Sequence, residues 1–265
     1  MSRGDKIIKV VFTDLDGTML DAYTGSYSES LNGIELLKEY KIPLVFCSAK
    51  TRVEQEFIRE NLDINDPFIV ENGSAIFIPE DYFSFPTGEK RGEYEVIELG
   101  VSYGSIRKEI DRLRDNYDIV GFGHLTSDKV AEITGLTKNL AELAKRREYS
   151  ETLVKVSDEA VELLKKRFNV VFGGRFIEVL GKNADKGRAV RILIKMFRKE
   201  FGEVVTFGIG NSVNDEPMLR EVDYAYLVKN PDGSWVDLEE LDAERVEGIG
   251  PEGWNMAIKE ICSEK

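Results

Sequence analysis

The sequence predicts an α/β fold in which a Rossmann-like core with a parallel sheet carries a smaller, inserted α/β cap domain. Short apolar, β-branched runs alternate with helical patterns up to residue 82, and the same alternation returns after residue 182. Between these parts the pattern changes to short strands and hairpin signals. Apolar strands without strict polar alternation are buried on both faces, which is typical of parallel sheets flanked by helices.

The first part of the chain is expected to alternate between strands and helices. Strands are predicted at residues 7–12, 42–46 and 67–70, and helices at residues 30–40 and 52–61. Thr51 is followed three residues later by Glu54, which is typical of a capping box and places a helix start at about Arg52. Thr51 is therefore as well explained by capping as by a functional role.

The last part of the chain is expected to add strands to the same sheet. A long helix should end at about Phe201, and either Asn183 or Asp185 is a suitable N-cap for it. Strands are predicted at residues 204–209 and 224–228, with a helix from about Asn214 between them. Residues 1–82 and 183–265 are therefore predicted to form one core domain.

Residues 83–182 are predicted to form the inserted cap. This region contains the strand-like segments YEVIEL (94–99) and YDIVGF (117–122), a helix at residues 105–116 and further helical runs to about Arg147. NVVFGG and RFIEVL follow, and two strand-like runs joined by Gly-Gly indicate a hairpin. A small antiparallel sheet is expected here.

Composition excludes several classes of partner. The formal net charge is −13, and basic residues do not cluster with aromatic ones, so we expect no nucleic acid partner. No apolar stretch approaches the ~20 residues of a spanning helix, so no membrane association is expected. Cys47 and Cys262 lie far apart without metal-ligand spacing, which favours the reducing cytoplasm. A monomer and a homodimer both remain open.

Two carboxylates follow the first predicted strand, in the segment VVFTDLDGTML. Ligands of parallel α/β sheets bind at the carboxyl ends of strands, so Asp14 and Asp16 should stand at the mouth of a site. At this spacing, one carboxylate can act as a nucleophile while the other protonates a leaving oxygen. The alternative is an Asp that only caps the following turn, and the functional interpretation is preferred because DLDGT comes together with the segments described next.

Two further strand ends carry groups suited to an anion. Ser48, in LVFCSAKTR, offers a hydroxyl and a backbone N–H that can hold a phosphoryl oxygen, and Lys50 and Arg52 are cations nearby. Lys186 lies in the first turn of the long helix, where the helix dipole mildly disfavours a cation. A lysine there is better explained if it faces a phosphoryl group and an Asp nucleophile.

The loop GIGNSVNDEPML predicts a magnesium site. Magnesium prefers oxygen ligands, and a carboxylate of the first strand together with Asn211, Asn214 and Asp215 supplies them. Ser212 or Asn214 is equally suited to cap the following helix. The set of predicted ligands is Asp14, Asp16, Asn211, Asn214 and Asp215.

DLDGT, the Ser48 segment, Lys186 and GNSVND together resemble the four signatures of the haloacid-dehalogenase-like phosphatases, whose sheet carries an inserted cap. CSAKTR, ENGSAIFIP, REYSE and GPEGWN further resemble the mannosyl-3-phosphoglycerate phosphatase family, over nearly the whole chain. The resemblance implies that Asp14 is the nucleophile, Asp16 the general acid and base, Ser48 and Lys186 the phosphate holders, and Mg²⁺ the cofactor.

The resemblance also implies a small phosphorylated sugar-glycerate substrate. The predicted substrate-binding residues are Lys50, Arg52, Glu71, Asn72, Gly73, Ser74, Arg147, Glu148 and Tyr149. An Arg binds a carboxylate with two parallel hydrogen bonds, so Arg52 and Arg147 are candidates for the glycerate group. Without the resemblance, residues 147–149 would be interpreted as the end of a cap helix with a surface ion pair.

One departure from the family pattern concerns the metal. Relatives commonly carry Asp where this sequence has Asn211, which removes one negative charge and leaves it open whether Asp215 binds the metal directly or through water. A broader sugar-phosphate or phosphoglycolate phosphatase, a phosphomutase and a catalytically silent phosphate-binding module are the competing interpretations.

Overall fold

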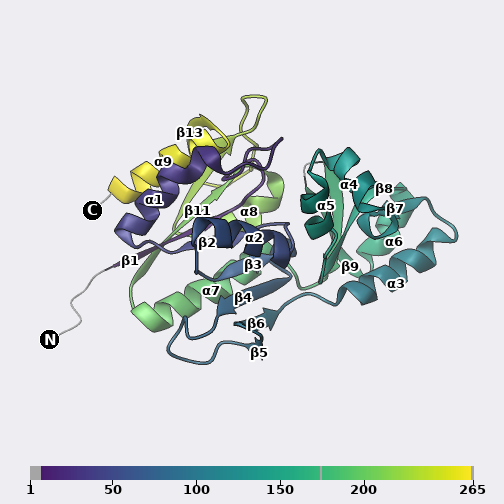
Figure 1. Ribbon diagram of the computed structural model, residues 1–265, viewed down its shortest axis with the longest axis horizontal. Coiled ribbons are helices and arrows are strands. Elements are labelled where there is room, and N and C mark those ends of the chain that lie inside the picture. Colours follow the sequence, from purple (N-terminus) through teal and green to yellow (C-terminus); the bar gives the residue numbers. More distant parts are fainter. Residues whose placement is uncertain (1–6, 174, 264–265) are drawn as a thin grey trace.

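The computed structural model describes residues 7–173 and 175–263 and arranges them in a larger and a smaller lobe (Figure 1). Among these residues, nine strands form the sheet of the larger lobe in the order β13-β12-β11-β1-β2-β3-β4-β6-β5. The strands are β1 (Ile8–Thr13), β2 (Leu44–Cys47), β3 (Phe68–Val70), β4 (Ala75–Pro79), β5 (Glu89–Arg91), β6 (Tyr94–Glu98), β11 (Val204–Gly210), β12 (Tyr224–Lys229) and β13 (Glu244–Ile249). Neighbours from β13 to β3 run parallel, whereas β4, β6 and β5 extend the sheet antiparallel.

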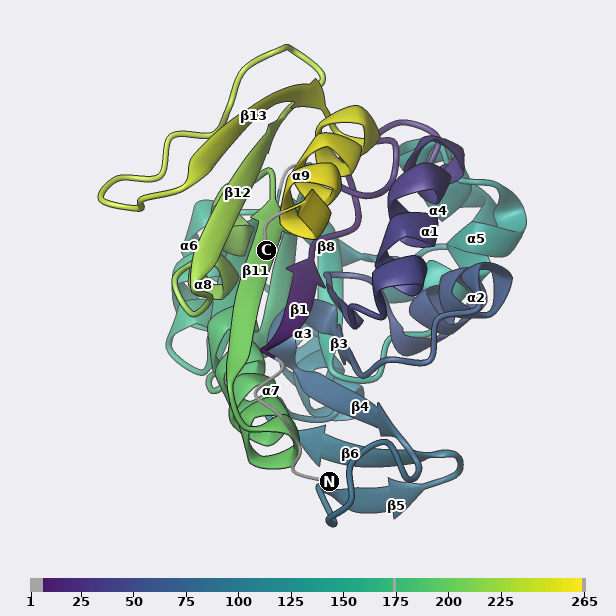
Figure 2. The ribbon, with the colours of Figure 1, turned by 90° about the vertical axis from the view of Figure 1, so that its left-hand side faces the viewer.

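Helices cover both faces of this sheet, as Figure 2 shows edge-on. One face packs against α1 (Leu31–Tyr40), α2 (Arg52–Leu62) and α9 (Pro251–Ser263), and the other against α7 (Lys186–Phe201) and α8 (Glu216–Leu219). β1 has no exposed residue, and its Val10 and Val11 point to opposite faces, each in a different apolar cluster. Burial on both faces is what an apolar run without polar alternation implies.

The smaller lobe is built on an antiparallel sheet of four strands among the described residues, in the order β7-β8-β10-β9. Its elements are β7 (Ile119–Gly121), β8 (Ser150–Val156), β9 (Phe168–Gly173), β10 (Phe176–Gly181), α3 (Tyr103–Arg114), α4 (Ser127–Thr134), α5 (Lys138–Ala144) and α6 (Asp158–Lys165). α3 and α6 pack on one face and α4 and α5 on the other. The predicted hairpin is present as β9 and β10, although its Gly174 lies outside the described residues.

The N-termini of two helices agree with the sequence analysis. The Thr51 hydroxyl accepts a hydrogen bond from the Glu54 backbone, and the Glu54 carboxylate accepts one from the Thr51 backbone, so the capping box is confirmed. Of the two N-caps considered for α7, Asp185 is the one used, because its carboxylate accepts from the Arg188 N–H at 2.7 Å. Lys186 is therefore the first residue of α7.

One strand differs from the prediction. The segment YEVIEL was expected in the sheet of the insert, but β6 pairs with β4 in the larger sheet. The reason is aromatic packing: Tyr94 meets Phe68 and Phe77 edge-on, with ring centroids 5.5 and 5.6 Å apart. Strand pairing thus assigns Tyr94–Glu98 to the larger lobe, and the division of the chain into core and cap domains stays a proposal.

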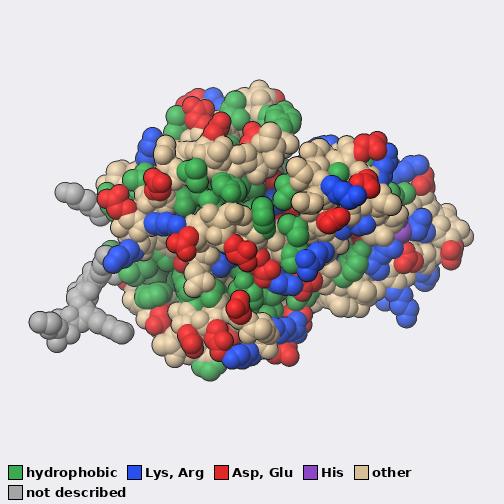
Figure 3. All heavy atoms as spheres, in the orientation of Figure 1, with side chains coloured by type: hydrophobic (Ala, Val, Ile, Leu, Met, Phe, Trp, Pro, Cys, Tyr) green, Lys and Arg blue, Asp and Glu red, His purple; other side chains and the backbone are tan. Residues whose placement is uncertain are grey.

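The surface carries interspersed charges. On the face shown in Figure 3, acidic and basic side chains lie among one another over both lobes, and neither sign forms a continuous stripe. The outermost strand, β5, exposes all three of its residues, and ion pairs join Lys90 to Glu80 and Arg91 to Glu98. Within the described part of the chain, no helix combines the length and the apolarity that crossing a bilayer requires.

Candidate active site

Three adjacent strands bring the predicted catalytic segments to one edge of the sheet. The register pairs Thr13 of β1 with Phe46 of β2 and with Ile209 of β11. Asp14 follows β1 directly, and its N–H donates to the Ile209 carbonyl at 3.0 Å. β2 ends at Cys47 and β11 ends at Gly210, so both strands end beside Asp14. This is expected for the carboxyl ends of parallel strands.

A buried cluster of one cation and two carboxylates lies at this edge. The Lys186 ammonium donates to Asp14 Oδ1 at 2.7 Å and to Asp215 Oδ1 at 2.6 Å. The side chains are 1%, 8% and 0% exposed, respectively. Side chains this deeply buried are held in place by such charge-assisted hydrogen bonds, and Lys186 thus joins the end of β1 to the loop after β11.

Burial changes the protonation behaviour of this cluster. It raises the pKa of Asp14 to about 7, with a further contribution from the neighbouring charge of Asp215 and an opposing one from Lys186. Burial by itself would lower the pKa of Lys186, but the two carboxylates outweigh it and the pKa lies above its ordinary value. Lys186 is therefore a permanent cation, while Asp14 is a carboxyl group poised between its two forms.

The loop after β11 is organised around Asp215. Its Oδ2 accepts from the N–H groups of Asn211 and Ser212 and from the Ser212 hydroxyl, each at 3.0 Å. Asn214 accepts from the same Ser212 hydroxyl. Both carboxylate oxygens of Asp215 are thus occupied, which makes this residue the structural centre of the loop.

The oxygen-bearing groups of this region suit a hard cation such as Mg²⁺. Asn211 Oδ1 accepts one hydrogen bond, from the Thr18 hydroxyl at 3.1 Å. Asn211 also lies close to the turn after Asp16, because a Cβ added at Gly17 would be only 2.6 Å from its Nδ2. Asp14 Oδ2 accepts no hydrogen bond from any described residue. Among the described residues no group of three or more His, Cys, Asp and Glu side chains is arranged as a metal site. The predicted set here combines carboxylates with the side-chain amides of Asn211 and Asn214.

Asp16 and the segment after β2 lie on the open side of the cluster. Lys50 Nζ contacts Asp16 Oδ1 at 2.9 Å and Glu54 at 3.6 Å, and the Asp16 side chain is 53% exposed. Ser48 is buried, and its hydroxyl accepts from the Lys50 N–H at 3.3 Å. Burial alone would lower the pKa of Lys50, but Asp16 and Glu54 raise it, so Lys50 is a cation beside the predicted general acid.

The predicted substrate residues occupy the junction between the lobes, and most of them already have partners. Arg52 is paired with Glu56 and Glu148, each at 2.7 Å. The turn between β3 and β4 is buried and contains Glu71, Asn72, Gly73 and Ser74. Arg147 and Tyr149, which lie between α5 and β8, are also buried. Arg147 is therefore not a surface residue at a helix end: α5 ends at Ala144.

The turn at Glu71–Gly73 lies close to the start of α7. A Cβ added at Gly73 would stand 2.1 Å from the Asp185 carbonyl oxygen, so only glycine fits there. The Asn72 N–H donates to the Ser48 carbonyl at 2.9 Å, and the Glu71 N–H donates to the Lys50 carbonyl at 3.1 Å. The turn thus connects the Ser48 segment with the helix that carries Lys186.

Sequence reasoning did not single out several residues that the structure brings to this region. Glu178 of β10 accepts from Asn72 Nδ2 at 2.9 Å, and Asn230, which follows β12, bonds Asn211 through both its amide oxygen and its amide nitrogen. Each had a signal in the sequence. Glu178 is an acid inside an apolar strand, and Asn230 is a polar residue at the end of a buried one.

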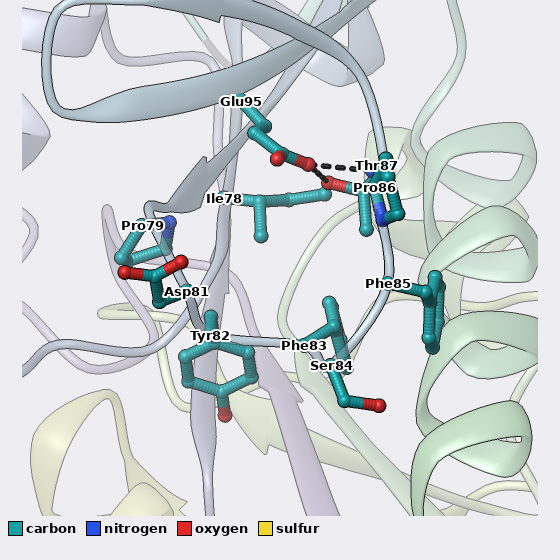
Figure 4. A pocket seen from close by; sticks show the side chains of 10 residues that line it. All are labelled: Ile78, Pro79, Asp81, Tyr82, Phe83, Ser84, Phe85, Pro86, Thr87 and Glu95. Carbon is teal, nitrogen blue, oxygen red and sulfur yellow. Dashed lines mark hydrogen bonds between the residues drawn. The ribbon is translucent and has the colours of Figure 1, made fainter.

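A pocket of about 200 Å³ lies elsewhere, under the loop between β4 and β5 (Figure 4). Its lining includes Tyr82, Phe83 and Phe85, and Glu95 closes one side through hydrogen bonds to Thr87. None of the predicted catalytic residues lines it. The smaller lobe approaches the loop after β11 instead: a Cβ added at Gly173 of β9 would lie 3.4 Å from Asn214 Nδ2.

Comparison with known proteins defines the class to which this fold and site belong. A family profile described as haloacid dehalogenase-like hydrolase matches residues 11–86 and 105–234, and the chain belongs to this family. Solved structures show the same fold at low sequence identity. Thermoplasma acidophilum 0175 superposes with a TM-score of 0.68 at 17% identity, covering 96% of this chain and 98% of that one.

Curated relatives are much closer in sequence. The glucosyl-3-phosphoglycerate/mannosyl-3-phosphoglycerate phosphatase of Methanococcoides burtonii is 44% identical over 265 residues, which cover 95% of this chain and 96% of the relative. The mannosyl-3-phosphoglycerate phosphatase of Pyrococcus furiosus is 43% identical over 246 residues, covering 92% and 97%. The family predicted from the four motifs is confirmed.

Proposed function

We propose that this protein is a magnesium-dependent phosphatase that hydrolyses mannosyl-3-phosphoglycerate, and also glucosyl-3-phosphoglycerate, to the glycosylglycerate and inorganic phosphate. The observation that carries the reaction type is Asp14, a buried carboxyl group with Oδ1 on Lys186 and with Oδ2 lacking a hydrogen bond from any described residue. The names and high identity of the two curated relatives support the choice of substrate.

Asp14 is the proposed nucleophile. Its Oδ2 attacks the phosphorus atom, so that a P–O bond to Asp14 forms while the bond from phosphorus to the glycerate oxygen breaks. Lys186 and Ser48 offset the charge on the phosphoryl oxygens. Because Lys186 is fixed by Asp215 as well as Asp14, its charge is in position before the substrate binds.

Asp16 is the proposed general acid and base. Its carboxyl group protonates the departing glycerate oxygen, and the resulting carboxylate then takes a proton from the water that hydrolyses the aspartyl-phosphate. Lys50 contacts this carboxylate at 2.9 Å, which holds Asp16 beside the end of β1.

The metal would be held by Asp14, by the main-chain carbonyl of Asp16 and by Asn211, with Asp215 shaping the loop from behind. A bound Mg²⁺ supplies charge neutralisation at the phosphoryl oxygens. One chain contains every group proposed here, so the reaction is the same for a monomer and for a homodimer. Cys47 and Cys262 are free and buried, and we place the reaction in the reducing cytoplasm on that basis.

The proposal is tested by phosphate release with Mg²⁺ from mannosyl- and glucosyl-3-phosphoglycerate, against mannose 6-phosphate, phosphoglycolate and free 3-phosphoglycerate. We expect kcat/KM to be highest for the two glycosylated compounds. Equal hydrolysis of the simple phosphates would retain the mechanism and remove the substrate assignment. Ligand binding without turnover would favour the silent binding module instead.

A further inference from the structure

A second buried charged cluster lies at the junction between the lobes and is formed by Arg147, Glu71 and Glu178. The three side chains are 4%, 0% and 9% exposed. Arg147 Nη2 donates to both Glu178 oxygens at 3.2 Å. Arg147 Nε donates to the Ser150 hydroxyl at 2.9 Å, and that hydroxyl donates to Glu71 at 2.5 Å. Ser150 thus links the arginine to Glu71, whose nearest oxygen is 3.7 Å from Arg147.

Arg147 also contacts the segment after β2. Its Nη2 donates to the Ala49 carbonyl at 2.9 Å. Ala49 lies between Ser48, a proposed phosphate holder, and Lys50, which contacts Asp16. An arginine that follows α5 of the smaller lobe therefore fixes the main chain that presents two groups of the proposed active site.

The turn at Glu71–Gly73 fixes the same segment from its other side. It bonds the carbonyls of Ser48 and Lys50, one residue before and one after Ala49. Glu71 and Asn72 have positive φ angles of 47° and 56°, which is costly for residues other than glycine. Such strain persists only where the surroundings over-determine the backbone, and Glu71 meets this condition by accepting from the N–H groups of Glu148 and Tyr149 as well as from Ser150.

The segment at residues 147–150 is consequently an attachment of the smaller lobe to the larger one, in addition to the two chain crossings near residues 100 and 182. Tyr149 is 4% exposed and packs into the apolar cluster of the larger lobe. Moving this segment away would expose Tyr149 and leave Glu71 without three donors, and each unmet buried group is costly.

We propose, on the basis of the proposed phosphatase reaction, that Arg147 is a positioning residue: it ties the cap to the segment at residues 48–50 and does not clamp the carboxylate of the substrate. Nε and Nη2 of Arg147 are already bonded to protein acceptors, whereas a carboxylate clamp requires parallel donors that face a ligand. The position of Ser48, a proposed phosphate holder, and of Lys50, which contacts Asp16, then depends on the docked cap. This assigns Arg147 a different role from the glycerate clamp considered from the sequence.

The two roles are separated by comparing Arg147→Lys with the wild type on p-nitrophenyl phosphate, which has no carboxylate, and on mannosyl-3-phosphoglycerate. Lysine keeps the charge but loses the planar, multidirectional donors. A positioning role predicts that kcat falls on both substrates by a similar factor of about 10 to 100. A rise in KM confined to mannosyl-3-phosphoglycerate, with p-nitrophenyl phosphate turned over normally, would overturn the proposal.

Ser150→Ala is the second variant, in case Arg147→Lys does not fold. It removes the hydroxyl that links Arg147 to Glu71 and adds no charge, so a smaller loss of kcat on both substrates is expected. Unchanged kcat on both would refute the positioning role. The matched control is Arg146→Lys, because Arg146 is the exposed neighbour of Arg147 in the chain and should behave as wild type.

Failure of the proposed substrate would be recognised separately. A wild type that hydrolyses p-nitrophenyl phosphate but not the glycosylated compounds loses its substrate assignment, while the test of Arg147 stands on p-nitrophenyl phosphate alone. Calorimetry of inorganic phosphate binding in the presence of Mg²⁺ measures how well the segment at residues 48–50 holds phosphate, without any turnover. Positioning predicts weaker binding in Arg147→Lys, whereas a clamp for the substrate carboxylate predicts unchanged binding.

Discussion

The molecule contains two buried clusters of the same composition, each with one cation between two carboxylates. In the larger lobe Lys186 lies between Asp14 and Asp215, and at the junction Arg147 lies between Glu71 and Glu178. They differ in how completely their oxygens are bonded. Glu71 accepts from three donors, whereas one oxygen of Asp14 accepts from no described residue.

This difference separates a structural role from a chemical one. A buried charge is tolerated when all its oxygens are hydrogen-bonded, and such a cluster holds the backbone around it in place. A carboxylate that keeps one oxygen without a donor is less stable than its neighbours and is available to a phosphorus atom or a metal. Burial and charge alone therefore do not identify the reactive cluster. Its mark is a carboxylate oxygen that has no donor among the described residues, because the buried oxygen without a partner at the junction, Asn72 Oδ1, belongs to an amide.

The strongest test removes the incompletely bonded carboxylate. We expect Asp14→Asn to lower kcat by about 10⁴-fold or more, because an amide cannot form the aspartyl-phosphate. The variant should still fold, since the hydrogen bond between Lys186 and Asp215 remains. Phosphate release and circular dichroism check the two expectations, and appreciable residual turnover would contradict the role of Asp14.

Lys186→Met should damage both activity and stability. We expect a fall in kcat of about 100-fold or more from the lost phosphoryl contact, and a loss of about 3–5 kcal/mol because two buried carboxylates lose their cation. Urea denaturation measures the second quantity. Lys195→Met is the matched control, because Lys195 is exposed on the same helix and should change neither. Wild-type stability of Lys186→Met would show that the cluster does not need its cation.

Asn211→Asp adds a carboxylate to the proposed metal site. We expect the Mg²⁺ concentration for half-maximal activity to fall by about tenfold, since a charged ligand binds the ion more strongly than an amide. The hydrogen bond from Asn211 Nδ2 to Asn230 is lost, at a cost of about 1 kcal/mol. A magnesium titration of activity is the measurement, and an unchanged requirement would argue that Asn211 is not a ligand.

The smallest expected effect concerns the pH dependence of stability at the junction. Burial raises the pKa of Glu71, although Arg147 and the three donors oppose this. A carboxyl group with a folded-state pKa above its unfolded value of 4.5 stabilises the fold most below that value and loses this contribution as pH rises through the folded pKa. Glu71→Gln lacks this term, so the difference in unfolding free energy between wild type and variant should narrow above pH 4.5. Urea titrations from pH 4 to 8 measure it, and a widening difference would contradict the raised pKa.

The sequence predicted the strands from β1 to β3 and β11 to β12 because they are apolar runs that alternate with helical patterns. It did not predict β13, whose two buried residues, Val246 and Gly248, alternate with exposed ones. Nor did it predict the place of β6, which depends on aromatic contacts with β3 and β4. Tertiary packing decides such segments, and no local pattern reports it.

Asp14, Asp16 and Ser48 were found because they follow closely on strands that a regular sheet places side by side, and Lys186 because it is a cation in the first turn of a helix. The junction could not be derived in this way. Arg147 bonds Glu178 within the smaller lobe and reaches Ala49 of the larger one, and the second contact depends on how the two lobes pack together. In the sequence, residues 147–149 are a charged and aromatic segment after a helix. Such a segment is equally compatible with residues that bind a ligand and with residues that attach one lobe to the other.

The charged strand β5 has a consequence for how the molecules meet one another. It is the outer edge of a nine-stranded sheet, where unpaired backbone groups can recruit a strand from a second molecule. Three exposed, charged residues on a short strand oppose that pairing, because a joining strand would have to desolvate Lys90 and Arg91 together with their acidic partners. This edge is therefore protected against aggregation through sheet extension, even where the protein is concentrated.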